Sequence, residues 1–117
     1  MEIKQLQHAH GISFFLTGRI DSFTAPLFEK KLKESQQAGT YRFFINFKDV
    51  TFINSTALGM LIEILNTNQA NKGNLYIYNI PANIMRIFRI TKLNEVFPIY
   101  ADADDVAEKL SIDLPVA

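Results

Sequence analysis

Cysteine and tryptophan are both absent from this chain of 117 residues. The absence of cysteine excludes disulfides and thiolate metal sites, and it is compatible with a reducing cytoplasm. The chain also lacks an excess of charge, because 12 lysine and arginine residues balance 12 aspartate and glutamate residues. A chain without net charge has no electrostatic footprint for nucleic acid or anionic membranes. We therefore expect no nucleic-acid partner.

Long apolar runs are missing as well. The longest clusters, such as Phe43-Phe44-Ile45, are far too short to span a bilayer. The first residues, Met1 to Gln7, lack the apolar region of a signal peptide. These features predict a cytoplasmic protein that does not insert directly into membranes.

The residues that are present are typical of a globular domain. Hydrophobic residues make up 48% of the chain and charged residues 21%, a balance that favours a folded core over disorder. Ten phenylalanines supply that core with large apolar rings. No repeat, low-complexity tract or linker interrupts the sequence, so we expect one domain over residues 1–117.

The pattern of apolar residues predicts strands that alternate with helices after an opening hairpin. Alternation indicates strands at 2–7, 12–17, 41–47, 74–78 and 96–100. Caps and helical spacing indicate four helices, which begin near Pro26, Ser55, Pro81 and Asp102. The last strand contains Pro98, which cannot donate to a ladder, so this strand belongs at an edge. The predicted fold is α/β, a mixed β-sheet of about five strands packed against about four helices.

The most informative local feature is the turn Asn54-Ser55-Thr56, where a strand gives way to a helix. Side-chain oxygens at this point can cap the free backbone N–H groups of the helix. The same end of a helix is favourable for negative charge, so the fold would tolerate a phosphate on either hydroxyl. Such a phosphate would change the surface by nearly two charges. The turn therefore has the properties of a switch on a binding module.

The helix after this turn has two apolar faces. One stripe packs on the sheet and consists of Leu58, Leu61, Ile62 and Leu65. Three more apolar residues, Ala57, Met60 and Ile64, lie a third of a turn or more away from it. They form either an exposed docking patch for a protein partner or a surface that a neighbouring helix covers. Periodicity alone does not separate these alternatives.

Two long segments carry a family resemblance. The first, Gly18-Arg19-Ile20-Asp21-Ser22-Phe23-Thr24-Ala25, resembles the pattern G-x-[IL]-D-x-x-[ST]-A. The second runs from Phe47 through Asn54-Ser55-Thr56 to Gly59 and resembles l-x-x-v-x-f-[MI]-D-S-[ST]-G-L-G. Shorter segments fit the downstream pattern: Gly73-Asn74-Leu75, Ile84-Met85-Arg86-Ile87-Phe88 and Thr91-Lys92-Leu93. In order and spacing, the chain is similar to STAS domain proteins of the bacterial anti-sigma factor antagonist type.

The resemblance implies a STAS-like fold and a partner-switching regulator of transcription. In such proteins an anti-sigma factor that is itself a serine kinase phosphorylates a serine in the central turn. The unphosphorylated protein binds this kinase and frees a sigma factor, and a PP2C-type phosphatase resets the switch. Ser55 occupies the phosphorylated position here. The implied partner surface comprises Asp21, Thr24, Asn54, Thr56, Ala57, Gly59 and Met60. The chain would act as a monomer or weak dimer, without cofactor, metal or catalytic activity.

This chain departs from the family pattern at two positions. Asn54 replaces an acidic residue, and Ala57 replaces a glycine. Asn54 can still cap the helix, but it removes a charge beside the target hydroxyl. The methyl group of Ala57 crowds a partner that approaches the backbone closely. The alternative function is an accessory subunit of a lipid or anion transport complex that is never phosphorylated.

Other interpretations of the polar residues are simpler. Ser55 alone is explained as a plain helix cap, and Thr56 is a second candidate for modification. His8 and His10 lack further metal ligands, and the acidic run from Asp102 to Asp105 lacks the pattern of a calcium loop and suits capping. No phosphate loop or nucleophile elbow is present, although a Ser-His-Asp arrangement assembled in three dimensions would make a hydrolase.

Overall fold

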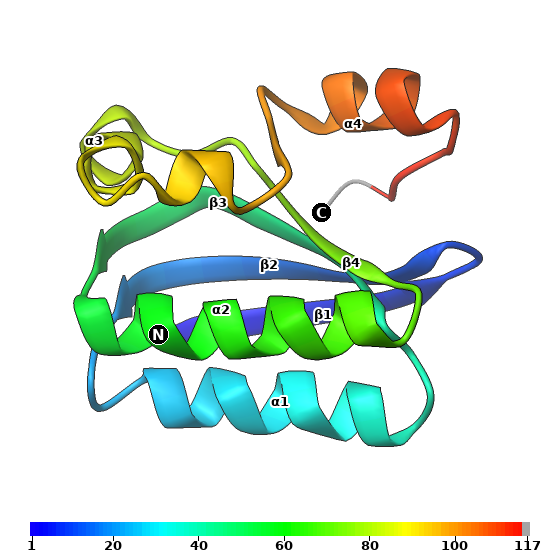
Figure 1. Cartoon of the computed structure of the whole chain (residues 1–117), viewed down its shortest axis with the longest axis horizontal. Coiled ribbons are helices and arrows are strands. Elements are labelled where there is room, and N and C mark those ends of the chain that lie inside the picture. Colours follow the sequence, from blue (N-terminus) through cyan, green and yellow to red (C-terminus); the bar gives the residue numbers. More distant parts are fainter. Residues whose placement is uncertain (116–117) are drawn as a thin grey trace.

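The chain forms one β-sheet whose five strands lie side by side in sequence order, from β1 to β5 (Figure 1). The structure is a computed structural model and describes residues 1–115. Its elements are β1 (Glu2–His8), β2 (Gly11–Ile20), α1 (Ala25–Gln37), β3 (Arg42–Ile53), α2 (Ser55–Ala70), β4 (Asn74–Tyr78), α3 (Ala82–Ile90), the 3-10 turn η1 (Leu93–Glu95), β5 (Ile99–Tyr100) and α4 (Ala103–Leu110).

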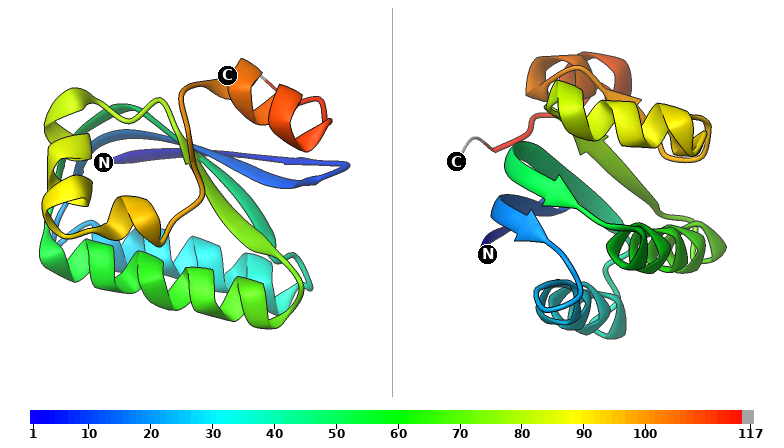
Figure 2. Two further views of the ribbon diagram at one scale, coloured as in Figure 1. Left: turned by 45° about the horizontal axis from the view of Figure 1, so that its top comes forward. Right: turned by 90° about the vertical axis from the view of Figure 1, so that its left-hand side faces the viewer.

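The sheet is mixed, as predicted. The hairpin of β1 and β2 is antiparallel, whereas the β2–β3, β3–β4 and β4–β5 pairs are parallel. Helices α1 and α2 lie side by side on one face of the sheet, and α4 lies on the other (Figures 1 and 2). The predicted α/β class with about five strands and about four helices is therefore confirmed within residues 1–115.

Strand β3 is the centre of the molecule and is buried on both faces. Phe43, Ile45 and Phe47 point into the larger core, which α1 and α2 close. Phe44 points the other way, into a smaller cluster with Tyr76, Tyr78 and Val106. Sequence alternation predicts one apolar face for this strand, and the structure shows that α4 gives the opposite face a small core of its own.

Three strands differ from the prediction by three or more residues at one boundary, and the first of them is β2, which extends past Thr17 to Ile20. β3 extends past Phe47 to Ile53, and β5 contains only Ile99 and Tyr100. The residues expected to start β5 instead continue the turn of η1, because the N–H groups of Val96 and Phe97 both donate to the Leu93 carbonyl. The edge position expected for β5 from Pro98 is confirmed.

The structure decides between the two alternatives left open for Ala57, Met60 and Ile64, because all three are buried. Their exposed fractions are 0%, 7% and 1%, because α1 lies directly beside α2 and covers this face (Figure 2). A buried hydrogen bond of 2.9 Å from Gln36 Nε2 to Asn68 Oδ1 joins the two helices. The alternative in which a neighbouring helix covers these residues is the correct one.

Candidate functional site

The parallel pairing of β2 and β3 brings two loops to one end of the sheet. Ile20 and Ile53 are register partners at the carboxyl ends of these strands, and the Asn54 N–H donates to the Ile20 carbonyl at 3.2 Å. Ligand and partner sites of parallel sheets gather at the carboxyl ends of strands. The loop 21–24 and the turn 54–56, which lie at least 30 residues apart in the sequence, therefore form one surface.

Asn54 holds this surface together. It is the N-cap of α2, with extended backbone angles (φ −107°, ψ 175°), and its Oδ1 accepts from the Ala57 N–H at 3.0 Å. Its Nδ2 donates to Ser22 Oγ at 3.2 Å and so ties the turn to the neighbouring loop. The capping role predicted from the sequence is confirmed, and the amide makes a bond that a carboxylate could not donate.

Ser55 and Thr56 are the first two residues of α2, and both are exposed. Among the described residues, neither hydroxyl makes a hydrogen bond in the structure. They line an open groove of about 350 Å³ between the N-terminal halves of α1 and α2. The other lining residues are Ala25, Pro26, Glu29, Gly59, Met60 and Glu63. The hydroxyls are therefore accessible to a partner or a modifying enzyme.

Asp21 and Thr24 act within their loop as a local scaffold. Asp21 Oδ1 accepts from the N–H groups of Phe23 and Thr24, at 3.0 and 3.1 Å, and Thr24 Oγ1 donates to the Arg19 carbonyl at 2.7 Å. The Phe23 N–H does most to lower the pKa of the Asp21 carboxyl, and the N–H and hydroxyl of Thr24 lower that pKa further. Asp21 is therefore a stable anion at the edge of the surface, 3.6 Å from the Arg19 guanidinium.

The predicted partner residues fall into three groups. Ser55, Thr56, Gly59 and Met60 meet in the groove, although Met60 contributes only a small exposed area to its floor. Asp21, Thr24 and Asn54 belong to the adjoining loop and turn. Ala57 is fully buried under α1, so its side chain is part of the core and the expectation of a partner-facing methyl group is wrong.

Sequence reasoning missed the most exposed aromatic residue of this surface. Phe23 is 89% exposed between Asp21 and Thr24, and Leu27, one turn along, is 60% exposed. A phenylalanine in a polar loop, outside any apolar period, is the sequence signal that points to it. Glu29 and Glu63 were also missed, because nothing local in the sequence brings α1 and α2 together at one groove.

The ring of His8 makes its hydrogen bonds within the β1–β2 hairpin. His8 Nε2 lies 3.0 Å from Ser13 Oγ, and Nδ1 accepts from the His10 N–H at 3.2 Å. Burial lowers the pKa of His8, and the neighbouring His10 and Arg42 lower it further. Within residues 1–115 no group of three or more His, Cys, Asp or Glu side chains is placed to hold a metal ion. None of the helices in this range is long and apolar enough to cross a membrane.

Comparison with known proteins agrees with this architecture. The family model of the STAS domain matches residues 2–106. An anti-sigma-B factor antagonist of Staphylococcus epidermidis is 29% identical over 99 residues, which cover 85% of this chain and 92% of that protein. The anti-sigma-B factor antagonist of Staphylococcus aureus is 32% identical over 82 residues, which cover 70% of this chain and 76% of that protein.

Solved structures show the same fold at lower sequence identity. The crystal structure of an anti-sigma factor antagonist from Mycobacterium paratuberculosis superposes with a TM-score of 0.82 at 21% identity, covering 94% of this chain and 93% of that one. The phosphorylated form of SpoIIAA, a cell fate determinant of Bacillus, superposes with a TM-score of 0.71 at 14% identity, covering 92% of this chain and 99% of that one. The likeness establishes the fold of the described chain.

Proposed function

The chain belongs to the STAS domain family, and from this membership we propose that it is an anti-sigma factor antagonist. Relatives that match most of its length bear that name. In the proposed mechanism the chain binds an anti-sigma factor that is a serine kinase, and thereby frees a sigma factor. Phosphorylation of Ser55 ends this binding, and a PP2C-type phosphatase restores it.

The observation that carries the proposal is the exposed pair of hydroxyls at the N-terminus of α2. No acidic side chain occupies the first turn of this helix, so the positive end of its dipole is not already neutralised there. A phosphate on Ser55 would lie where backbone N–H groups favour an anion. The fold would therefore accept the modification, and its effect would fall on the partner.

The surroundings of Ser55 supply the contacts that a partner would use. Phe23 projects from the loop beside the turn, and its ring offers an apolar anchor of the kind that dominates protein interfaces. Glu29 and Glu63 line the groove next to Ser55 and favour a basic side chain of the partner. A phosphate in this tight, partly apolar contact would place an unpaired charge there and weaken the complex.

Two variants distinguish Ser55 from Thr56 as the phosphorylated residue. We expect Ser55→Ala to bind the cognate anti-sigma kinase as the wild type does and to resist phosphorylation by it. Thr56→Ala is the matched control, because it removes the neighbouring exposed hydroxyl, and it should still be phosphorylated. Intact-mass measurement and phosphosite mapping of each chain after incubation with kinase and ATP identify the residue.

Ser55→Asp tests the consequence for binding. The added carboxylate should weaken the complex by about tenfold or more, because it brings an unpaired negative charge into the interface. Isothermal titration calorimetry of the kinase with each variant measures the change in affinity. If Ser55→Asp and Ser55→Ala both bind as tightly as the wild type, the switch does not operate through this residue.

Isolation of the protein from its native cells distinguishes between the antagonist function and the transport-subunit function. A tagged full-length chain should capture a serine kinase that regulates a sigma factor, and a fraction of the chain should carry phosphate. Capture of an ATP-binding transport subunit by a chain that stays unmodified in both growth and stress would instead assign the accessory role.

A further inference from the structure

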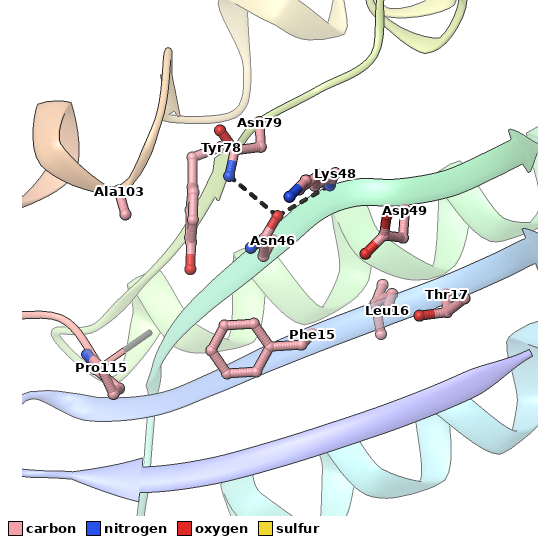
Figure 3. A pocket seen from close by; sticks show the side chains of 10 residues that line it. All are labelled: Phe15, Leu16, Thr17, Asn46, Lys48, Asp49, Tyr78, Asn79, Ala103 and Pro115. Carbon is pink, nitrogen blue, oxygen red and sulfur yellow. Dashed lines mark hydrogen bonds between the residues drawn. The ribbon is translucent and has the colours of Figure 1, made fainter. Parts of the chain in front are cut away.

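A second pocket lies on the opposite face of the sheet, away from α1 and α2. It occupies about 330 Å³, at the low end of the range of small-molecule sites (about 300–1,000 Å³). Figure 3 shows it between β2, β3 and β4, with α4 at its rim. Its lining residues are Phe15, Leu16, Thr17, Asn46, Lys48, Asp49, Tyr78, Asn79, Ala103 and Pro115.

A β-bulge gives this pocket its charged residues. Phe15 pairs with Asn46 and Thr17 pairs with Asp49, so three steps along β3 match two along β2. The extra residue places Lys48 and Asp49 together at the pocket, where strict alternation would send them to opposite faces. Both are exposed, and neither makes a salt bridge with another described residue. The rim therefore carries one positive and one negative charge, neither of which is paired with a charged side chain within residues 1–115.

The floor of the pocket consists of two amides in a fixed arrangement. Asn46 Oδ1 accepts from the Lys48 N–H at 2.9 Å and from Asn79 Nδ2 at 3.2 Å (Figure 3). The NH₂ group of Asn46 and the side-chain oxygen of Asn79 make no hydrogen bond with another described residue. Asn79 has a positive φ of 56°, a backbone conformation that asparagine adopts more readily than most residues.

Tyr78 adds a hydroxyl group to the pocket. The residue is only 1% exposed, and its hydroxyl makes no hydrogen bond with the described residues. Figure 3 shows the hydroxyl pointing into the pocket beside Asn46. Burial raises the pKa of Tyr78 to about 12, so the group remains a neutral donor throughout the biological pH range. Among residues 1–115 no fully buried side-chain polar atom lacks a hydrogen-bond partner, so the Tyr78 hydroxyl reaches solvent through the pocket and can donate to a ligand there.

We propose that this pocket binds a small zwitterion of the amino-acid class. Its ammonium group pairs with Asp49 and its carboxylate with Lys48, while its polar side chain contacts Asn46, Asn79 and Tyr78. The half-buried ring of Phe15 supplies the apolar wall. A pocket with one charge of each sign repels part of any ligand that is only an anion or only a cation, and this favours a molecule carrying both. The site is independent of the proposed antagonist function, because it lies on the other face of the sheet.

Titration of the ¹⁵N-labelled full chain with free amino acids tests the proposal. The probes are glycine, L-serine and L-glutamine, with N-acetyl-L-glutamine (no ammonium) and L-glutaminamide (no carboxylate) as charge controls. We expect saturable shifts of the amides of Thr17, Asn46 and Tyr78 with at least one zwitterion. Both derivatives should bind about tenfold more weakly or worse. Absence of saturable shifts with all three zwitterions, or equal binding of the derivatives, overturns the proposal.

Variants locate the bound molecule. Asp49→Asn and Tyr78→Phe should each weaken binding about tenfold, the first through the ammonium and the second through one hydrogen bond. Tyr78→Phe removes a single oxygen from a cluster that is otherwise apolar or aromatic, so the fold is preserved and the ¹⁵N spectrum confirms it. Lys30→Gln is the control, because Lys30 lies on α1 across the sheet. Binding that is unchanged in Asp49→Asn and Tyr78→Phe places the ligand elsewhere and overturns the proposal.

Discussion

Asn54 is the residue at which the fold and the proposed switch meet. Its carbonyl oxygen caps α2 through the Ala57 N–H, and its amide nitrogen reaches Ser22 in the neighbouring loop. The position is next to Ser55, so an acidic residue there would stand beside the hydroxyl that we propose is phosphorylated. An amide at this place keeps the cap and lowers the negative charge that a phosphate on Ser55 would face.

Substitution of Asn54 tests how much the N-cap of α2 contributes to stability. Asn54→Ala should lower the free energy of unfolding by about 1 kcal/mol, because one N–H at the start of α2 loses its acceptor. Asn54→Asp should retain the cap and gain about 0.3–1 kcal/mol from its charge at the helix N-terminus. Urea denaturation at neutral pH measures both. Asn66→Ala, on an exposed position of the same helix, is the control and should not destabilise the protein.

An Asn54→Ala protein that unfolds at the same urea concentration as the wild type would show that water replaces the cap without loss. The bond to Ser22 can be tested separately with Ser22→Ala, which keeps the cap intact.

At the scale of elements, the end of α2 is fixed by a close approach of two backbones. Gly73 follows the helix, and its N–H donates to the Asn68 carbonyl at 2.7 Å. A Cβ at this position would collide with the carbonyl oxygen of Tyr41, just before β3 begins. Gly59, in contrast, lies inside α2 with open space around it. Two glycines of the same segment thus have opposite structural roles.

This contrast predicts that alanine substitutions at the two glycines change the stability of the protein in opposite directions. Gly73→Ala should destabilise the protein by about 1–3 kcal/mol, since the backbone of Tyr41 cannot give way cheaply. Gly59→Ala should stabilise it by up to about 1 kcal/mol, because alanine restricts the unfolded chain and favours the helix. Thermal unfolding of both variants, side by side, provides the measurement. Equal destabilisation by the two would contradict the geometry described for Gly73.

Across the whole molecule, the two faces of the sheet differ in how firmly they are covered. The larger core contains residues of α1, α2 and α3, whereas the smaller cluster has four buried members, of which only Val106 comes from α4, with Ala103 and Leu110 of the same helix half-buried against it. A helix of eight residues with one fully buried and two half-buried apolar side chains on the sheet has less packing to stabilise it than α1 or α2 has. The proposed ligand pocket lies at the less firmly covered face, and the proposed switch lies at the end of the firmer one.

Amide hydrogen exchange tests this difference. Amides of β3 and α2 should open only with global unfolding, while those of α4 should exchange at least about tenfold faster through local opening. Exchange followed by NMR at several low urea concentrations separates the two modes, since local opening depends weakly on urea. Protection of α4 equal to that of β3 would mean that the sheet and its outer helix unfold as one unit.

Local features of the sequence determined the elements and their caps. Alternating apolar residues marked the strands, Pro26 and Asn54 marked helix starts, and Asp102 was expected to cap α4, which its 2.8 Å bond from the Asp105 N–H confirms. These signals depend on neighbours within about four residues, so a single chain contains all the information they need. Ser55 as the modified residue stays a prediction that rests on family resemblance.

Only the tertiary structure decided which faces are covered. Met60 and Ile64 have the spacing of an exposed stripe, and their burial depends on where α1 packs. Phe23 and the acidic side chains of the groove form one surface because β2 and β3 end side by side. The bulge that gathers Lys48 and Asp49 at a pocket depends on the register of two strands. Periodicity fixes the direction of a side chain relative to its own element, whereas burial and proximity depend on contacts between residues far apart in the chain.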